Sequence, residues 1–83
     1  MSRELRATVL VRPKQGILDP QGEAVQGSLR KLGFDVSRVR VGRVLDVELA
    51  ADGPEARAQV ERMCVELLAN PLIESFEIQL EDA

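Results

Sequence analysis

The sequence predicts a small α+β domain whose elements follow in the order β-α-β-β-α-β. Apolar residues alternate with polar ones in several short segments, and two longer segments carry apolar residues at helical spacing. Gly, Pro and Asp residues separate these segments. Strands with one apolar face and two amphipathic helices favour an antiparallel sheet with both helices on one face, the ferredoxin-like arrangement. With 83 residues and no linker, residues 1–83 are expected to form a single domain.

The first strand is predicted where every second residue is apolar, at Leu5, Ala7, Val9 and Val11. Pro13 ends this strand because proline has no N–H to donate to a sheet. A short loop then leads to the first helix.

The first helix begins within Leu18-Asp19-Pro20-Gln21-Gly22. Asp19 is the expected N-cap, since its carboxylate can accept hydrogen bonds from the first turn, and Pro20 suits the first helical position. Gly22 stands where Glu or Gln would complete a capping box, and glycine there lowers helix propensity by roughly 1 kcal/mol relative to Ala. Close approach by another chain would explain this glycine.

We expect this helix to span Pro20 to Leu32 and to end at Gly33, which supplies the left-handed position common after a helix. A second glycine, Gly27, lies inside the helix, and contact with a partner or simple sequence drift explains it equally well. The apolar stripe of the helix consists of Ala24, Val25, Leu29 and Leu32.

The segment from Val36 to Val41 alternates as a second strand, with Val39 and Val41 on one face and Arg38 and Arg40 on the other. Two continuations are open. Either Gly42-Arg43 forms a hairpin turn before a third strand with an apolar face, or Gly42 marks a bulge in one long bent strand from about Val36 to Ala50. The apolar face of the third strand consists of Leu45, Val47 and Leu49.

The second helix is expected to begin at Asp52-Gly53-Pro54 and to stop at Pro71. The last strand presents one apolar face, with Leu72, Phe76, Ile78 and Leu80. The apolar stripe of the helix consists of Ala56, Val60, Met63, Cys64, Leu67 and Leu68.

The composition argues against several classes of partner and site. A net charge of −3 and a pI near 4.9 argue against nucleic acid and against an anionic membrane surface. With no histidine and one cysteine, the chain lacks the usual transition-metal ligands and any internal disulfide, and we expect no cofactor on it. No signal peptide or membrane span is evident, so a cytoplasmic protein is expected. A domain with so small a core usually gains additional stability from disulfides, a metal or association with other chains. Of these, association is the one that this sequence leaves open.

No catalytic group is expected on this chain. Cys64 lies on the apolar stripe of the second helix without a histidine to activate it, which is typical of a core cysteine. No serine lies in a nucleophile-elbow motif, no glycine-rich phosphate loop is present, and paired carboxylates on sheet faces are usually solvated. The residues alone therefore favour a protein-interaction module that forms an oligomer.

Five short segments, each common by itself, occur in a specific order within the 83 residues. They are Val11-Arg12-Pro13-Lys14, Leu18-Asp19-Pro20-Gln21-Gly22, Leu32-Gly33-Phe34, Val39-Arg40-Val41-Gly42-Arg43, and Met63-Cys64 continuing through Leu67-Leu68-Ala69-Asn70-Pro71 to Ile73-Glu74. In this respect the chain resembles, nearly end to end, the PurS family of small subunits of phosphoribosylformylglycinamidine (FGAM) synthase. Family members often carry Lys where this chain has Arg43, which keeps the charge.

The resemblance implies a PurS-like fold and a subunit role in de novo purine biosynthesis. The FGAM synthase complex converts formylglycinamide ribonucleotide to formylglycinamidine ribonucleotide with ATP and glutamine. It implies partners in the PurL synthetase subunit, which uses ATP and Mg, and in the PurQ glutaminase subunit, which releases ammonia. The small subunit itself is implied to hold no active site, to form a homodimer or tetramer, and to support assembly and ammonia transfer.

Two exposed and distinctive turns are the candidate contacts with the larger subunits, comprising Asp19, Pro20, Gln21, Gly22, Arg40 and Arg43. Two other interpretations share the same order of elements. One is a stand-alone small-molecule sensor of the ACT type, which binds amino acids at dimer interfaces. The other is a small enzyme such as an acylphosphatase, although the loop at Gly16 does not supply its anion-binding pattern.

Overall fold

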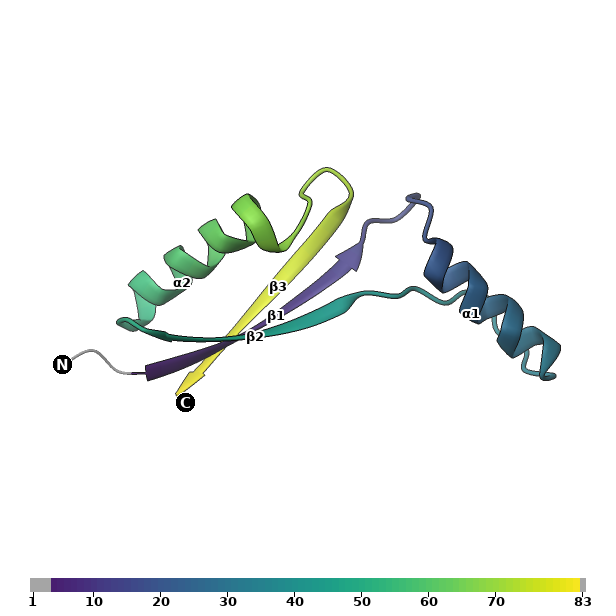
Figure 1. The fold of residues 1–83 in the computed structure, drawn as a ribbon, viewed down its shortest axis with the longest axis horizontal. Coiled ribbons are helices and arrows are strands. Elements are labelled where there is room, and N and C mark those ends of the chain that lie inside the picture. Colours follow the sequence, from purple (N-terminus) through teal and green to yellow (C-terminus); the bar gives the residue numbers. More distant parts are fainter. Residues whose placement is uncertain (1–3, 83) are drawn as a thin grey trace.

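A computed structural model describes residues 4–82 of the protein. Three antiparallel strands form one sheet in the order β2-β1-β3, so β1 is central (Figure 1). The predicted antiparallel α+β class is confirmed. The elements are β1 (Glu4–Pro13), α1 (Pro20–Lys31), β2 (Arg43–Ala50), α2 (Gly53–Met63), the π-helix η1 (Cys64–Leu68) and β3 (Glu74–Asp82).

The core lies between one face of the sheet and the helix pair α2–η1. Val9 and Val11 of β1, Val60 of α2 and Cys64 of η1 are fully buried. The apolar residues that alternate along β1 therefore face the core, as predicted. The prediction of a core cysteine at Cys64 is also confirmed. Both outer strands contribute half-buried apolar residues to the same face, namely Leu45, Val47, Leu49, Phe76, Ile78 and Leu80.

The opposite face of the sheet carries charges. Arg6 lies 3.5 Å from Glu48 on β2 and 3.6 Å from Glu81 on β3, measured between side-chain nitrogen and oxygen atoms. Thr8 donates a hydrogen bond to Asp46 at 3.2 Å. These pairs are exposed and contribute little stability each, but they give the sheet a hydrated side.

The structure differs from the expected arrangement in the position of α1. This helix does not cover the sheet beside α2. Together with the returning segment 34–42 it projects beyond the end of the sheet (Figure 1), and we call residues 14–42 the arm and the remainder the body. The radius of gyration is 16.3 Å, whereas a compact domain of this length has about 12 Å.

The segment predicted as a second strand is extended but does not join the sheet. Val39 and Val41 donate their backbone N–H groups to side chains of α1 and its cap. The chain does not reverse at Gly42-Arg43 and runs directly into β2, so the long continuous segment is observed and the hairpin is not (Figure 1). Pairing of β2 begins at Arg43 opposite Val11, close to Pro13, which has no N–H to extend the ladder.

The last turn of the second helix is wider than predicted. Ala69 donates its N–H to the carbonyl of Cys64, five residues earlier, at 2.9 Å, which is the π-helical spacing. This widening turns Leu67 outward, so Leu67 is 83% exposed and not part of the buried stripe. Leu72 lies in the following turn and is 84% exposed, so its predicted place on the apolar face of β3 is wrong.

Within residues 4–82 no helix is both long and apolar enough to cross a membrane.

The tight packing of α2 against β1 gives a prediction. Val60→Ala removes two fully buried methyl groups and is expected to lower the free energy of unfolding by about 2 kcal/mol. The matched control is Val65→Ala, which shortens a half-exposed side chain one turn later and is expected to cost less than about 0.5 kcal/mol. Urea unfolding at one fixed protein concentration measures both, and equal losses would contradict the assignment of the core.

Candidate functional site

The candidate site is the joint where the arm leaves the body. A cavity of about 290 Å³ lies there, between the first turn of α1, the start of β2 and the loop before β3. Its lining joins segments far apart in the sequence, namely Pro13, Ile17, Leu18, Asp19, Pro20, Gln21, Val41, Gly42, Arg43, Ile73 and Glu74.

Asp19 connects the helix to the returning segment. Its Oδ1 accepts a hydrogen bond from the N–H of Gly22 at 3.0 Å, as expected for an N-cap. Its Oδ2 accepts a second hydrogen bond, from the N–H of Val41 at 2.7 Å. These two backbone donors, that of Val41 first, hold the pKa of Asp19 below its ordinary value. The carboxylate therefore remains ionised and acts as a structural acceptor.

The unusual glycine in the first turn of α1 is explained by the same contact. Gly22 is buried, and a Cβ atom there would overlap the carbonyl oxygen of Val39 and the carboxylate of Asp19. The close approach is thus made by this chain's own returning segment and not by a second chain. Gly42 has an equivalent role on the body side, where a Cβ would overlap the carbonyl oxygen of Val11.

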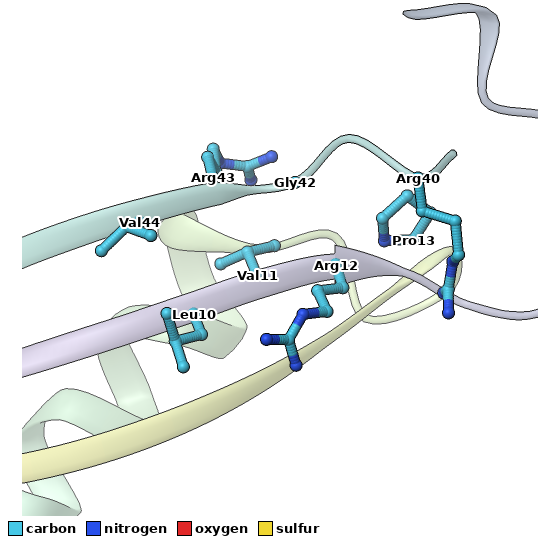
Figure 2. A pocket seen from close by; sticks show the side chains of 8 residues that line it. All are labelled: Leu10, Val11, Arg12, Pro13, Arg40, Gly42, Arg43 and Val44. Carbon is cyan, nitrogen blue, oxygen red and sulfur yellow. The ribbon is translucent and has the colours of Figure 1, made fainter. Parts of the chain in front are cut away.

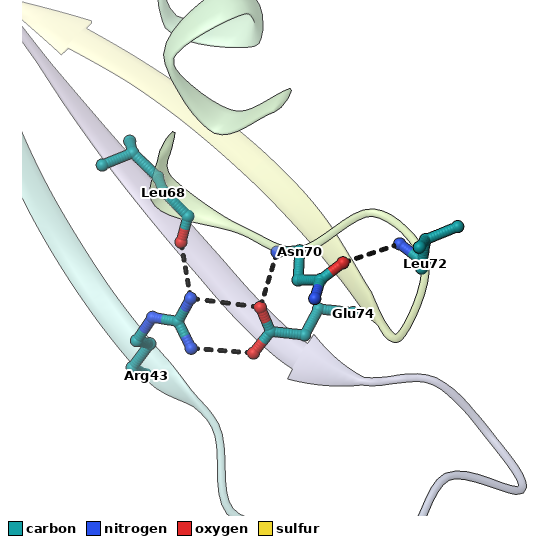
Figure 3. Close-up of polar contacts among 5 residues, drawn as sticks. All are labelled: Arg43, Leu68, Asn70, Leu72 and Glu74. Carbon is teal, nitrogen blue, oxygen red and sulfur yellow. Dashed lines mark hydrogen bonds and ion pairs between the residues drawn. The ribbon is translucent and has the colours of Figure 1, made fainter. Parts of the chain in front are cut away.

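An ion pair holds the start of β2 to the start of β3 (Figure 3). Arg43 binds Glu74 through its two terminal guanidinium nitrogens, with N–O distances of 2.7 Å and 3.1 Å. One of them also donates a hydrogen bond to the carbonyl of Leu68 at 2.6 Å. Bidentate hydrogen bonding of this kind between arginine and a carboxylate is strong and directional. The hydrogen bond with Arg43 keeps the pKa of Glu74 low and raises the pKa of Arg43.

The loop before β3 is secured by the same network. Glu74 also accepts a hydrogen bond from the N–H of Asn70 at 2.7 Å, and the side chain of Asn70 accepts one from the N–H of Leu72 at 3.1 Å (Figure 3). Lys14, at the root of the arm, donates its ammonium to the carbonyl of Pro71 at 2.7 Å. The loop, the start of the arm at Lys14 and Arg43, which directly follows the arm, therefore lie in one hydrogen-bonded cluster.

The structure brings most of the six candidate contact residues together. The cavity at the joint is lined by Asp19, Pro20, Gln21 and Arg43, and Gly22 is buried directly behind Asp19. Arg40 instead lines an adjacent cavity of about 460 Å³ (Figure 2), which shares Pro13, Gly42 and Arg43 with the first cavity. Of the six, Pro20, Gln21 and Arg40 are exposed, and no hydrogen bond of theirs is described, although the positive charge of Arg40 helps to lower the pKa of Asp19. Asp19, Gly22 and Arg43 form hydrogen bonds within the chain.

Sequence reasoning missed Glu74 as the partner of Arg43. No spacing rule links residues 31 positions apart, because their proximity depends on the register of two strands with β1 between them. The available signal was indirect: Glu74 is an acidic residue at the start of an otherwise apolar strand face. Among residues 4–82 no three acidic or sulfur side chains gather where they could hold a metal ion.

The two helical glycines form a matched pair for mutation. Gly22→Ala places a Cβ against the Val39 carbonyl and is expected to lower the free energy of unfolding by about 1–3 kcal/mol. Gly27 has open space around it, so Gly27→Ala is expected to raise stability by roughly 0.5–1 kcal/mol. Thermal and urea unfolding at constant protein concentration test this, and a stabilised Gly22→Ala variant would refute the proposed close approach.

The ion pair at the joint predicts a pH dependence. Because the pKa of Glu74 is lower in the folded state than its unfolded value of about 4.3, its stabilisation is present above that value. It is lost as the pH falls through the folded pKa. Glu74→Gln should therefore destabilise the protein at pH 7 and have a much smaller effect at acid pH, once the carboxylate of Glu74 is protonated. Glu66→Gln, which alters an exposed ion pair with Arg62, is the control and should change stability little at either pH.

Comparison with known proteins assigns this chain to a family. A family model described as PurS, phosphoribosylformylglycinamidine (FGAM) synthase, matches residues 6–82. The chain is similar to the FGAM synthase subunit PurS of Methanocaldococcus jannaschii, with 38% identity over 78 residues, covering 92% of this chain and 94% of the relative.

Solved structures agree with this match. Thermus thermophilus PurS superposes with a TM-score of 0.83 at 43% identity, covering 96% of this chain and 98% of that one. A chain in the structure of PurLQS from Thermotoga maritima superposes with a TM-score of 0.83 at 29% identity, covering 94% and 98%. The chain described here therefore belongs to the PurS family of FGAM synthase subunits.

Proposed function

We propose that this chain is the non-catalytic small subunit that bridges the PurL synthetase and PurQ glutaminase subunits of FGAM synthase. The likeness to a chain of PurLQS along nearly its whole length supports this role. The complex would convert formylglycinamide ribonucleotide to formylglycinamidine ribonucleotide in the cytoplasm. ATP and Mg would be used by the synthetase subunit, and this chain would carry no cofactor.

The observation that carries the proposal is the large apolar surface left uncovered on a chain of 83 residues. Large apolar side chains are exposed both on the arm and at the end of the body, namely Leu18, Leu32, Phe34, Leu67 and Leu72, between 58% and 84% exposed. Extensive exposed apolar surface marks sites of interaction with other proteins. An elongated chain with such surface at both ends is suited to contact more than one partner.

A homodimer or tetramer forms part of this proposal. The arm is separated from the body core, since neither buried core cluster includes a residue of the arm. Isolated helices of about 12 residues are marginal in water, and the described contacts of α1 outside the helix are made with the returning segment of the same arm. Association supplies the packing that the arm lacks within one copy.

The joint supplies the contacts with the larger subunits. Pro20 and Gln21 are exposed at the first turn of α1, and Arg40 presents an exposed side chain at the adjacent cavity. Asp19, Gly22 and Arg43 hold these residues in position by their internal contacts. Sealing the junction between two larger subunits would keep ammonia away from bulk water, where it would be protonated or lost.

Gln21 provides the cleaner test of this surface, because Arg43 also supports the fold through Glu74. Gln21→Ala is expected to weaken assembly with the synthetase and glutaminase subunits while leaving unfolding unchanged. Gln59→Ala, at an exposed position of α2, serves as the control and should assemble normally. Analytical ultracentrifugation of the three-subunit mixture measures this, and normal assembly of Gln21→Ala would exclude the joint as a contact.

Reconstitution tests the role as a whole. The matching synthetase and glutaminase subunits are mixed with and without this chain, and product formation is followed with glutamine or with free ammonia. We expect the glutamine-dependent rate to require the chain and the ammonia-dependent rate to be independent of it. If neither rate changes, the bridging role fails, and thermal stabilisation by individual amino acids would then test the sensor interpretation.

A further inference from the structure

We propose that the cavity of about 460 Å³ at the end of the sheet where the arm departs binds a small phosphorylated ligand (Figure 2). The ligand class is a phosphate monoester that carries a flat apolar group, as a nucleoside monophosphate does. We call this site the arginine cavity, because Arg12 and Arg40 supply the charge that would bind the phosphate. The inference concerns a ligand of this chain and goes beyond its proposed role in assembly.

The lining of the arginine cavity is positively charged. The chain as a whole has a net charge of −3, yet among the described residues the cavity is lined by three arginines and by no acidic side chain. Arg43 is bound to Glu74, which leaves Arg12 and Arg40 to bind a ligand. Figure 2 shows these two side chains extending in the same direction, one from β1 and the other from the segment before β2. The cavity therefore offers two guanidinium groups from different parts of the chain.

Both of these arginines are available to a ligand. No hydrogen bond or ion pair of the Arg40 side chain is described within residues 4–82, although its charge attracts the carboxylate of Asp19. Arg12 lies 4.0 Å from Glu77, and the two side chains are 62% and 61% exposed. This distance is longer than a hydrogen bond, and exposed ion pairs contribute little stability. A ligand anion can therefore compete with Glu77 for Arg12.

An apolar pair lies beside the arginines. Leu10 and Val44 are directly opposite each other in the register of β1 and β2, and both line the cavity. Val44 is 61% exposed, on the face of β2 that also carries Asp46 and Glu48, because residues two apart in a strand share a face. An apolar surface next to a few charged groups is typical of small-molecule sites. It suits a ligand with a flat apolar part and an anionic end.

The arrangement of donors favours phosphate over a carboxylate. Each guanidinium group presents a planar fork of N–H donors that matches two oxygen atoms of an anion. A phosphate monoester has three terminal oxygens and nearly two negative charges at neutral pH, so two guanidinium groups can bind it at once. A carboxylate has two oxygens and one charge. The volume of the cavity also lies within the range of small-molecule sites, about 300–1,000 Å³.

Isothermal titration calorimetry of the full chain tests the site with adenosine 5′-monophosphate (AMP) as the probe. Adenosine, inorganic phosphate and succinate are the comparison ligands, all at one ionic strength. We expect AMP to bind most tightly, because it alone carries both the phosphate and the flat apolar group, and its affinity should fall as salt is added. Adenosine binding as tightly as AMP would overturn the anion site. Inorganic phosphate or succinate binding as tightly as AMP would overturn the ligand class.

Substitutions locate the binding to the arginine cavity. Arg12→Gln and Arg40→Gln should each weaken AMP binding about tenfold, because each removes a charged hydrogen-bond donor. The matched control is Arg62→Gln, which removes an exposed arginine that pairs with Glu66 at 3.4 Å and should leave the affinity unchanged. Glu77→Gln removes the competing carboxylate and should strengthen binding by up to about fivefold. General damage to the fold would not produce such a gain.

Binding is measured on this chain without the larger subunits, because Arg40 is also a proposed contact with them. Circular dichroism checks that each variant is folded. Folded Arg12→Gln and Arg40→Gln variants that bind AMP as tightly as the unmodified chain would overturn the site. A chain that binds no AMP but restores glutamine-dependent turnover in the reconstituted complex would overturn the ligand site and leave the bridging role intact.

Discussion

The contact between Arg43 and Glu74 sets the geometry on which the rest of the molecule depends. Arg43 begins β2 opposite Val11, and Glu74 begins β3 opposite Pro13, so their ion pair spans the end of the central strand. The guanidinium of Arg43 also donates a hydrogen bond to the backbone carbonyl of Leu68, at the end of η1. Both outer strands and the helix that covers them are thus fixed at one point, where the arm departs.

Two glycines allow the arm to depart there. Gly42 lies against the carbonyl of Val11, and Gly22 lies against the carbonyl of Val39, so each lets two backbones approach more closely than a side chain would permit. Asp19 then ties the helix to the returning segment through one carboxylate. Within the arm, α1 and the returning extended segment are held together by these contacts, although the apolar stripe of α1 is left uncovered.

This arrangement relates the shape of the chain to its role. A body built on Val9, Val11, Val60 and Cys64 has a small core, and the arm adds surface without adding to that core. In the proposed assembly, other chains supply the burial that the arm lacks within one copy, as in subunits that are stable only in assemblies. The raised pKa of the buried Cys64 thiol, caused mainly by desolvation, agrees with a packing role for this cysteine.

The sequence by itself determined the elements whose causes are local. Alternation defined β1 and β3, Asp19 and Pro20 defined the start of α1, and Gly33, with a φ of 99°, defined its end. Only the tertiary structure decided the contacts between residues that are distant in the sequence. The pairing of Arg43 with Glu74 and the contact behind Gly22 required the strand register and the path of the arm. Alternation at residues 36–41 predicted a strand, but the segment is extended without being a strand. A strand needs a neighbouring sheet edge, and among residues 4–82 no such edge pairs with this segment.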